Sequence, residues 1–406
     1  QNTENFLKWM GLSVLTGLVV GGASAIFAGC IKAATEYRDT HNWIFMLLPV
    51  AGVLIVFMYE KIGRQDGGTN QVLATIKSKD DVPFLSAPLI FVSTLLTHLT
   101  GGSAGREGAS IQFGGSIGNW LGKLAHLDEF DHHVMIMCGM SAAFAAVFGT
   151  PMAAAVFAME VVSVGVMYYA ALLPCVIAAI IAAEFATGMG IDPETFPVHS
   201  IPGLTVESGL KMALIAVGCG ILSILFCILL KTVGQLYAKY LKNPYIRIVV
   251  AAGVIILITI CLNTKDYMGA GSGLIARAIE KGEARPLDFL WKMLLTALTM
   301  RAGYRGGEIV PAFSIGATFG CVAGGILGFS PELAAAASMV ALFCGVTNCP
   351  ITAMLISFEL FGFSGAAYYL IAISISYAVS GYYSLYKDQT IVYSKYKARY
   401  INRKTR

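Results

Sequence analysis

The chain is a succession of apolar segments separated by short polar turns that are rich in glycine. The segments have helical lengths, and none alternates with the period of two that a membrane β-barrel strand requires. In the first half we expect apolar helices at 6–34, 43–59, 83–97, 111–124, 134–147, 152–166 and 168–187, and a short helix at 70–77. In the second half we expect them at 210–237, 246–262, 289–301, 312–327, 331–343, 350–361 and 366–385, and a short helix at 274–282. This pattern predicts an all-α, polytopic membrane protein.

Composition supports this prediction, since only 13% of the 406 residues are charged and 56% are hydrophobic. A soluble domain carries about a quarter charged residues. The net charge of +4 gives no indication of a nucleic-acid partner. Basic residues gather in the last segment of the chain, at Lys387, Lys395, Lys397, Arg399, Arg403, Lys404 and Arg406. By the positive-inside rule we expect a multi-pass protein of the plasma membrane or cell inner membrane with a cytoplasmic C-terminus.

Nothing in the sequence points to an enzyme. The nine cysteines lie mostly in apolar runs and have no metal-ligand spacing, so we expect no metal, no cofactor and no disulfide. There is no metal-binding helix motif, no nucleophile elbow and no phosphate-binding loop. We therefore expect a transport protein whose partners are small ions and the lipid bilayer.

The segment Gly101–Ser110 places two charges, Arg106 and Glu107, where an apolar segment breaks and a new helix begins. Irregular backbone within a membrane is tolerated only where protein buries it or where it lines a watery cavity. A helix that begins there points free N–H groups and partial positive charge at an anion. Glu107 is therefore a candidate functional carboxylate, with Gly105, Arg106 and Gly108 as candidate anion-binding neighbours.

The same features recur in the second half of the chain. Pro151 precedes Glu160 by nine residues, and Pro350 precedes Glu359 by nine residues, each across an apolar interval. The loop that contains Glu107 likewise matches a second loop, Gly306-Gly307-Glu308. The polar interval 188–206 lies between these copies, so we expect two repeats at 1–195 and 196–386, followed by a basic tail at 387–406. The spacing alone leaves parallel and inverted repeats open.

These motifs together resemble the CLC family of anion channels and anion/proton antiporters. The resemblance rests on Gly105-Arg106-Glu107-Gly108, on the Gly-Gly-Glu-Ile-Val-Pro of 306–311 and on the paired Pro-x8-Glu segments, and it extends from about residue 7 to residue 386. It implies two inverted halves with short or broken helices, and a homodimer with one pore in each subunit. It also implies that Glu107 is the gating glutamate, which occupies the anion path when ionised and leaves when protonated.

The resemblance implies further anion-binding positions. The family's first anion-binding stretch corresponds to Asp66–Asn70, where Gly68, Thr69 and Asn70 replace the usual serine-containing sequence. Ile309 and Val310 follow the second loop. The family's central tyrosine corresponds to Tyr386, with Tyr383 and Tyr393 as alternatives.

Three departures bear on the transported ion. Ala109 stands where the chloride branch commonly has proline, and Val161 stands where many chloride antiporters have an inner glutamate. Residues 97–107 and 306–308 are more similar to the fluoride-exporting branch. The methionine near Gly68 and the threonine near Val310 that this branch often has are absent here.

We therefore expect a CLC-type antiporter that exchanges a halide, fluoride in preference to chloride, for protons. The alternatives are a chloride/proton antiporter and a passive channel without proton coupling. Burial disfavours the charged form of a carboxylate, so Glu107 could take up protons near neutral pH. Glu308 is a second proton site, a neighbour of the anion site or a cap of the following helix. We expect Glu160 and Glu359 to bond helix ends, and Arg106 to pair with a carboxylate rather than to bind the anion.

Overall fold

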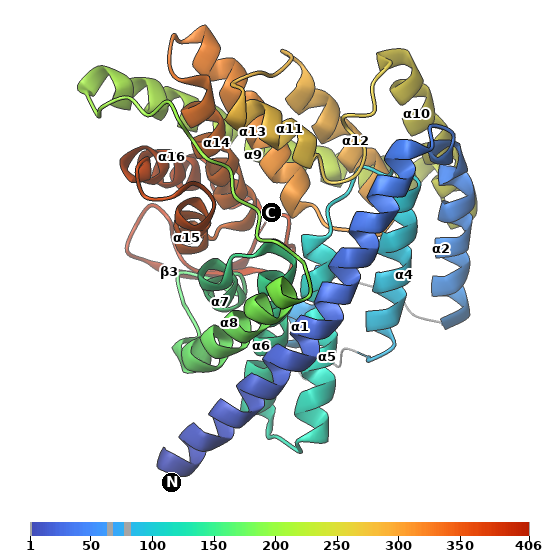
Figure 1. Ribbon diagram of the computed structural model, residues 1–406, viewed down its shortest axis with the longest axis vertical. Helices are drawn as coiled ribbons and strands as arrows, with labels where there is room; N and C mark the ends of the chain where they lie inside the picture. Colours follow the sequence, from blue (N-terminus) through green and yellow to red (C-terminus); the bar gives the residue numbers. More distant parts are fainter. Residues whose placement is uncertain (1, 63–67, 77–82, 406) are drawn as a thin grey trace.

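The computed structural model describes residues 2–62, 68–76 and 83–405 (Figure 1). Positions 66 and 67 of the predicted anion-binding stretch and position 77 of the predicted short helix lie outside these residues. The first eight helices are α1 (Asn2–Thr40), α2 (Leu48–Ile62), α3 (Thr69–Thr75), α4 (Ser86–Leu99), α5 (Glu107–Leu124), α6 (Glu129–Phe148), α7 (Pro151–Glu160) and α8 (Leu172–Gly188). The next eight are α9 (Val206–Tyr240), α10 (Pro244–Leu262), α11 (Ser272–Glu280), α12 (Asp288–Ala302), α13 (Ile309–Ile326), α14 (Pro331–Thr347), α15 (Pro350–Phe361) and α16 (Ala366–Val379). Short 3-10 helices at Ile44–Leu47 and Tyr169–Ala171 precede α2 and α8.

The two sets of eight helices pack in the same way. Helix α5 contacts α4 and α6, and α13 contacts α12 and α14 in the same pattern; likewise α1 packs on α8, and α9 packs on α16. Between the sets, helices in equivalent positions meet each other, as α2 does with α10, α5 with α13 and α7 with α15. Self-pairing of equivalent elements is the mark of an approximate two-fold axis. The two halves therefore form the repeat that was predicted, related by an approximate two-fold axis, and the boundary between residues 195 and 196 stays a prediction.

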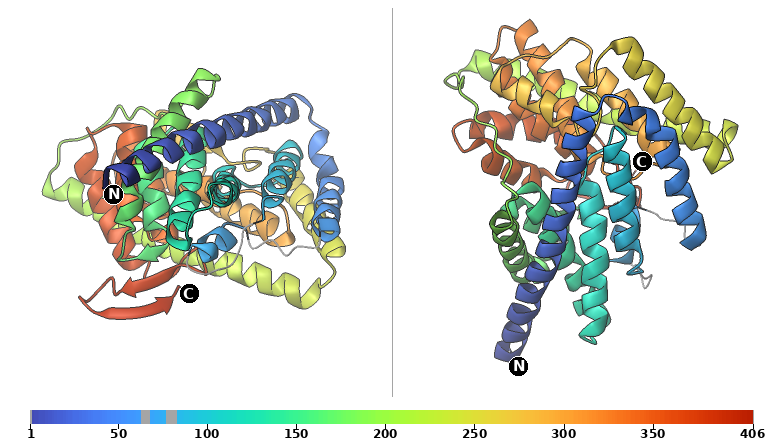
Figure 2. Two further views of the ribbon diagram at one scale, coloured as in Figure 1. Left: turned by 90° about the horizontal axis from the view of Figure 1, so that it is seen from below. Right: turned by 45° about the vertical axis from the view of Figure 1, so that its right-hand side comes forward.

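The helices vary widely in length, as expected for a transport protein with broken helices. Among the described residues, seven helical segments are long and apolar enough to cross a bilayer. Helices α1 and α9, with 39 and 35 residues, are the longest and cross the molecule obliquely (Figures 1 and 2). At about 1.5 Å per residue both exceed the roughly 30 Å of hydrocarbon, so they must tilt or extend beyond it. Helices α7 and α15, with 10 and 12 residues, are too short to span it.

Some predicted boundaries were wrong for local reasons. We expected a polar connection between the helices before residue 134, but α6 already begins at Glu129. The helix starts earlier because the Asp128 side chain caps it by accepting a hydrogen bond from the backbone N–H of Asp131. The apolar segment 152–166 leaves the helix after Glu160, where a run of β-branched valines favours extended backbone. The last apolar segment ends as a helix at Val379 rather than at residue 385.

The valine run forms part of a small sheet that the sequence did not predict. Strand β1 (Ser163–Val164) pairs in parallel with β2 (Thr390–Tyr393), which pairs antiparallel with β3 (Tyr400–Lys404). The left view of Figure 2 shows the red β2–β3 hairpin projecting from the helices. The prediction of an all-α protein therefore holds for the membrane-spanning part, and the basic tail adds a hairpin to it.

Glu160 and Glu359 cap each other's helices across the two halves. The Glu160 carboxylate accepts hydrogen bonds from the backbone N–H groups of Ile351 and Thr352, at 3.0 and 2.8 Å, in the first turn of α15. The Glu359 carboxylate accepts the corresponding bonds from Met152 and Ala153, at 2.8 and 2.9 Å, in the first turn of α7. These hydrogen bonds confirm the prediction that both glutamates bond helix ends.

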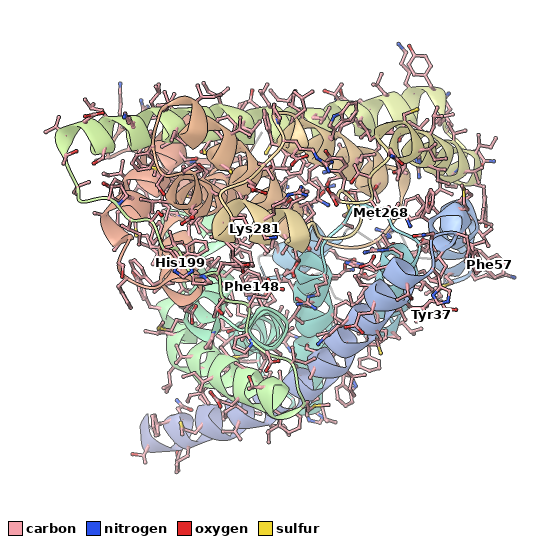
Figure 3. The ribbon with its side chains drawn as sticks, turned by 45° about the horizontal axis from the view of Figure 1, so that its top comes forward. Tyr37, Phe57, Phe148, His199, Met268 and Lys281 are labelled. Atoms are coloured by element: carbon pink, nitrogen blue, oxygen red, sulfur yellow. The ribbon has the colours of Figure 1, made fainter. Side chains whose placement is uncertain are left out.

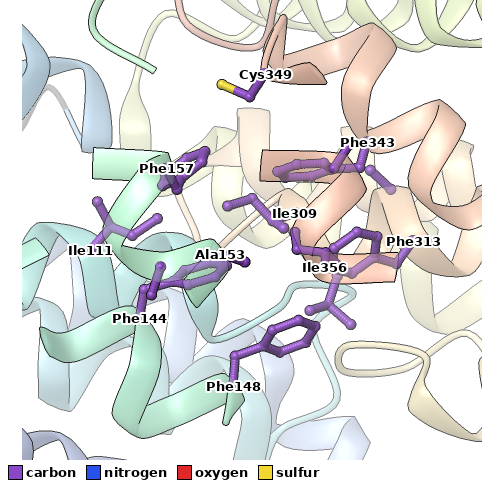
Figure 4. Packing of buried hydrophobic residues seen from close by; sticks show 14 of the residues in the cluster. Ile111, Phe144, Phe148, Ala153, Phe157, Ile309, Phe313, Phe343, Cys349 and Ile356 are labelled. Atoms are coloured by element: carbon purple, nitrogen blue, oxygen red, sulfur yellow. The ribbon is translucent and has the colours of Figure 1, made fainter. Parts of the chain in front are cut away.

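A closed circuit of five phenylalanines fills the core between the halves (Figure 4). Consecutive ring centroids lie 5.2–6.1 Å apart around Phe144, Phe148, Phe313, Phe343 and Phe157. Helices α6 and α7 supply three of the rings, and α13 and α14 supply two. This aromatic packing holds together the helices that frame the site.

Candidate functional site

Two loops, one from each half, cross at the centre of the molecule. Gly105 and Gly307 exchange both backbone hydrogen bonds, at 2.7 and 2.6 Å, in an antiparallel bridge. A Cβ atom added at Gly307 would lie 2.5 Å from the Gly108 nitrogen, so this crossing requires glycine. The bridge brings the first turns of α5 and α13 together.

The first turns of these helices present uncapped backbone N–H groups in a buried setting. The N-cap residues are Arg106 for α5 and Glu308 for α13, and neither side chain makes a capping hydrogen bond to its own helix. Gly108, Ile309 and Val310 are all buried. Helix α3 joins them, because its Thr69 hydroxyl donates a hydrogen bond to the Gly108 carbonyl at 3.1 Å. Such a cluster of helix starts favours an anion through N–H groups and helix dipoles.

The Glu107 carboxylate folds back onto the start of its own helix. One oxygen accepts a hydrogen bond from the Arg106 backbone N–H at 3.0 Å, and the other lies 3.5 Å from the Arg106 Nε. The side chain is 1% exposed. The Glu107 carboxylate therefore accepts a hydrogen bond from one of the backbone N–H groups that could otherwise bind an anion.

The Arg106 guanidinium faces carboxylates and a carbonyl, as predicted. Its Nη2 donates to the Glu194 carboxylate at 3.1 Å and to the Val147 carbonyl at 3.3 Å. No motif of the sequence pointed to Glu194, which is one of two acids in the polar segment 188–206 between the halves.

A cavity of about 590 Å³ opens beside Glu107, and we call it the Glu107 vestibule. Its wall includes Arg38, His98, Arg106, Glu107 and Glu194, together with the loop at 268–273. Met268 of that loop, labelled in Figure 3, covers Gly101. His98 bonds the Thr94 carbonyl through Nδ1 at 3.0 Å, while its buried Nε2 has no partner in the described part of the chain.

A second cavity, of about 580 Å³, reaches the crossing from the other loop, and we call it the Tyr386 vestibule. Its wall includes Gly68, Thr69, Asn70, Glu308 and Tyr386. Among the residues that line the two vestibules, none is shared between them. The crossing loops therefore separate two cavities, with Glu107 on one side and Glu308 on the other.

The tyrosine candidates separate in the structure. Tyr383 and Tyr386 both line the Tyr386 vestibule, and Tyr386 is buried with 3% exposure. Tyr393 lies exposed on β2, away from both vestibules, so it does not belong with the other predicted site residues. The tail positions Tyr386, since the Thr405 hydroxyl donates to its carbonyl at 2.7 Å.

The structure excludes one of the predicted roles of Glu308. The Glu308 carboxylate accepts a hydrogen bond from Arg301 at 3.2 Å and makes no side-chain cap to α13, so the capping alternative was wrong.

The C-terminal tail covers the position of the missing inner glutamate. There, the backbone carbonyl of Val161 accepts a hydrogen bond from the buried Gln389 side chain at 2.9 Å.

A buried lysine that the sequence analysis did not single out supports the first loop. Lys292 of α12 is 0% exposed and donates to the Ser103 hydroxyl at 3.0 Å. It also donates to the carbonyls of Tyr267 and Gly269, at 3.0 and 2.6 Å. These bonds join the loop before Arg106 to the wall of the Glu107 vestibule. Its only sequence signal is a cation inside the apolar segment 289–301.

Buried helix starts that lie between two cavities, beside a carboxylate, define a membrane protein of the anion-transport class. Comparison with known proteins agrees: the family model described as voltage gated chloride channel matches residues 51–381. The chain belongs to this family, the CLC family.

Named relatives and solved structures are similar over nearly the whole chain. A chloride/fluoride channel protein of Pseudomonas syringae pv. tomato is 34% identical over 400 residues, covering 96% of this chain and 88% of that protein. The crystal structure of a CLC-type fluoride/proton antiporter matches with a TM-score of 0.90 and 31% identity, covering 95% of this chain and 98% of that one. The H⁺/Cl⁻ exchange transporter ClcA of Vibrio cholerae is 25% identical over 382 residues, covering 86% and 81%.

Proposed function

We propose that this protein exchanges a halide for protons across a cell inner membrane or plasma membrane, with fluoride as the preferred halide. The observation that carries the proposal is the position of the Glu107 carboxylate, which accepts the Arg106 backbone N–H at the start of α5 and lines one of the two cavities that meet the crossing loops. A carboxylate resembles a halide in charge, so ionised Glu107 and the anion compete for one place. Protonation removes this competition and couples the two ions by mutual exclusion.

The anion seat is made of backbone rather than of charged side chains. Gly105, Arg106 and Gly108 supply it from the first half, and Ile309 and Val310 supply it from the second. Helix starts provide about half a charge each, which attracts an anion without trapping it. Arg106 takes part through its backbone, because its guanidinium is held by Glu194 and the Val147 carbonyl.

On the other side of the seat, the anion passes Gly68, Thr69 and Asn70 and then the Tyr386 ring. Glu308 is the second proton site, since it lies at the Tyr386 vestibule, where water can reach it. The basic tail is cytoplasmic by the positive-inside rule, and its Lys387 and Thr405 line this vestibule. The Tyr386 vestibule then faces the cytoplasm, and the Glu107 vestibule faces the outside. Two copies of the chain form a homodimer with one such path each.

The preference for fluoride rests on similarity to proteins whose names include it, at 34% and 31% identity, against 25% for the chloride exchanger. A passive channel is the second candidate, and Val161 favours it, because no carboxylate stands at this position. Exchange with chloride in place of fluoride is the third.

The variant Glu107→Gln tests the role of Glu107. We expect purified protein in liposomes to lose proton movement driven by a halide gradient, because the amide cannot release a proton, while the overall fold is unchanged. Glu184→Gln, an exposed carboxylate on α8, is the matched control. Proton movement by Glu107→Gln equal to that of the parent would show that another group carries the proton.

A further inference from the structure

We propose that Glu194 is a positioning residue of the transport site. It holds the Arg106 guanidinium to the side of the anion seat and offsets its charge when Glu107 is protonated or displaced. This inference rests on the anion seat proposed above and concerns a residue that lies outside both repeated motifs.

The Arg106 guanidinium donors face two carboxylates and a carbonyl. Nη2 contacts both the Glu194 carboxylate, at 3.1 Å, and the Val147 carbonyl, at 3.3 Å, and Nε lies 3.5 Å from Glu107. The guanidinium is therefore shared between two carboxylates. Its side chain and that of Glu194 are 18% and 23% exposed, so the pair is partly shielded from solvent.

The polar segment is held firmly where it carries Glu194. A Cβ atom added at Gly149 would lie 2.5 Å from the Pro193 Cα and 3.5 Å from the Glu194 nitrogen. Gly149 has a φ of 75° and ends α6, two residues after the Val147 carbonyl that Arg106 contacts. On the other side, the backbone N–H of the buried Phe196 donates to the Leu360 carbonyl at 3.0 Å. The end of α6 and this segment thus bring Glu194 to Arg106.

The net charge beside the anion seat changes when Glu107 takes up a proton. With Glu107 ionised, Arg106 and the two carboxylates sum to one negative charge, which repels a second anion. When Glu107 is protonated, Arg106 and Glu194 sum to zero, and a halide meets only backbone N–H groups. Without Glu194 the sum would be one positive charge. A guanidinium binds anions strongly through charge-assisted hydrogen bonds, so the halide would be held too tightly for fast release.

The test measures halide uptake into proteoliposomes as a function of halide concentration. In Glu194→Gln we expect KM and the maximal rate both to fall about tenfold, because one uncompensated charge near the seat favours binding and slows release. Glu194→Asp keeps the charge and is expected to stay close to the parent. Asp192→Asn removes an exposed acid two residues away and is the matched control.

A double variant identifies Arg106 as the residue through which Glu194 acts. In the double variant Arg106→Gln/Glu194→Gln both charges are removed, so the sum with protonated Glu107 is again zero, and KM and the maximal rate should return close to those of the parent. An unchanged KM in Glu194→Gln alone, a double variant that keeps the defect of Glu194→Gln, or the same defect in Glu194→Asp would each overturn the inference.

Titration calorimetry with sodium fluoride and with sodium chloride keeps this result separate from the proposed function. It reads halide binding to purified protein whether or not protons move. About tenfold tighter binding of either halide by Glu194→Gln supports the inference even if the parent proves to be a channel. Equal binding of both halides by parent and variant overturns it even if the parent is an antiporter.

Discussion

The reciprocal caps predict an unequal loss of stability in two equivalent variants. In Glu160→Gln, an amide replaces a carboxylate that accepts three hydrogen bonds: from Ile351 N–H, and from the N–H and hydroxyl of Thr352. The amide has one acceptor oxygen, so its NH2 group faces a backbone N–H that then has no partner. Losing one charge-assisted bond and stranding a buried donor costs about 2–4 kcal/mol, with the helix dipole included.

The equivalent change in the other half is expected to cost less. Glu359 accepts two hydrogen bonds rather than three, and its partner Met152 is exposed, so the freed N–H group is less deeply buried than those at Glu160. We expect Glu359→Gln to cost about 1–2 kcal/mol. The difference between the two variants follows from burial and from the additional Thr352 hydroxyl bond, because the N-cap backbone angles of α7 and α15 are nearly the same.

Thermal unfolding in detergent, followed with a thiol-reactive dye, measures this difference. Most cysteines are buried in the folded chain, and Cys344 and Cys349 lie close to the Glu160 cap, so dye labelling reports the loss of this packing. We expect the midpoint to fall by roughly 5 °C in Glu160→Gln and by about half as much in Glu359→Gln. An exposed carboxylate on α8 is the control, and Glu184→Gln should not move the midpoint. Equal losses in the two cap variants, or no loss in Glu160→Gln, would refute the reasoning.

Three further variants test the site. Gly307→Ala should reduce halide uptake at least tenfold, because the added methyl group pushes the crossing loops apart, whereas Gly209→Ala, where nothing lies within 4 Å of the added Cβ, should leave uptake unchanged. Lys292→Met should lower the unfolding midpoint, because it strands two buried carbonyls at a cost of about 1–3 kcal/mol each; an unchanged midpoint would exclude a structural role for this ammonium. Glu308→Gln should reduce proton movement more than halide uptake, and equal reduction of both would show that Glu308 does not act as a separate proton site.

The features that were predicted correctly depend on short stretches of sequence. Glycines and charges that interrupt an apolar run indicate a broken helix, and their recurrence indicated the two halves. The role of Glu160 and Glu359 could be predicted because a proline-initiated helix that ends on a carboxylate occurs twice, and a two-fold repeat brings each carboxylate to the other helix.

The features that were missed depend on where distant segments pass. Glu194 and Arg106 are 88 positions apart, and Lys292 and Ser103 are 189 positions apart. Neither pair lies in matching motifs of the two halves, so the repeat gave no indication of them. The small sheet needs three segments, of which β1 has only two residues, too few for an alternating pattern to show. The exclusion of Tyr393 likewise required the path of the tail.

The measurement that tests the central claim most directly is proton movement against its own gradient in liposomes that contain the purified protein. An outward halide gradient is imposed with an internal pH dye present, in one set with fluoride and in another with chloride. The account predicts uphill proton movement driven by fluoride and much less by chloride. Equal or greater coupling to chloride would contradict the fluoride preference, and halide flux without proton movement in either set would contradict antiport itself and leave a channel.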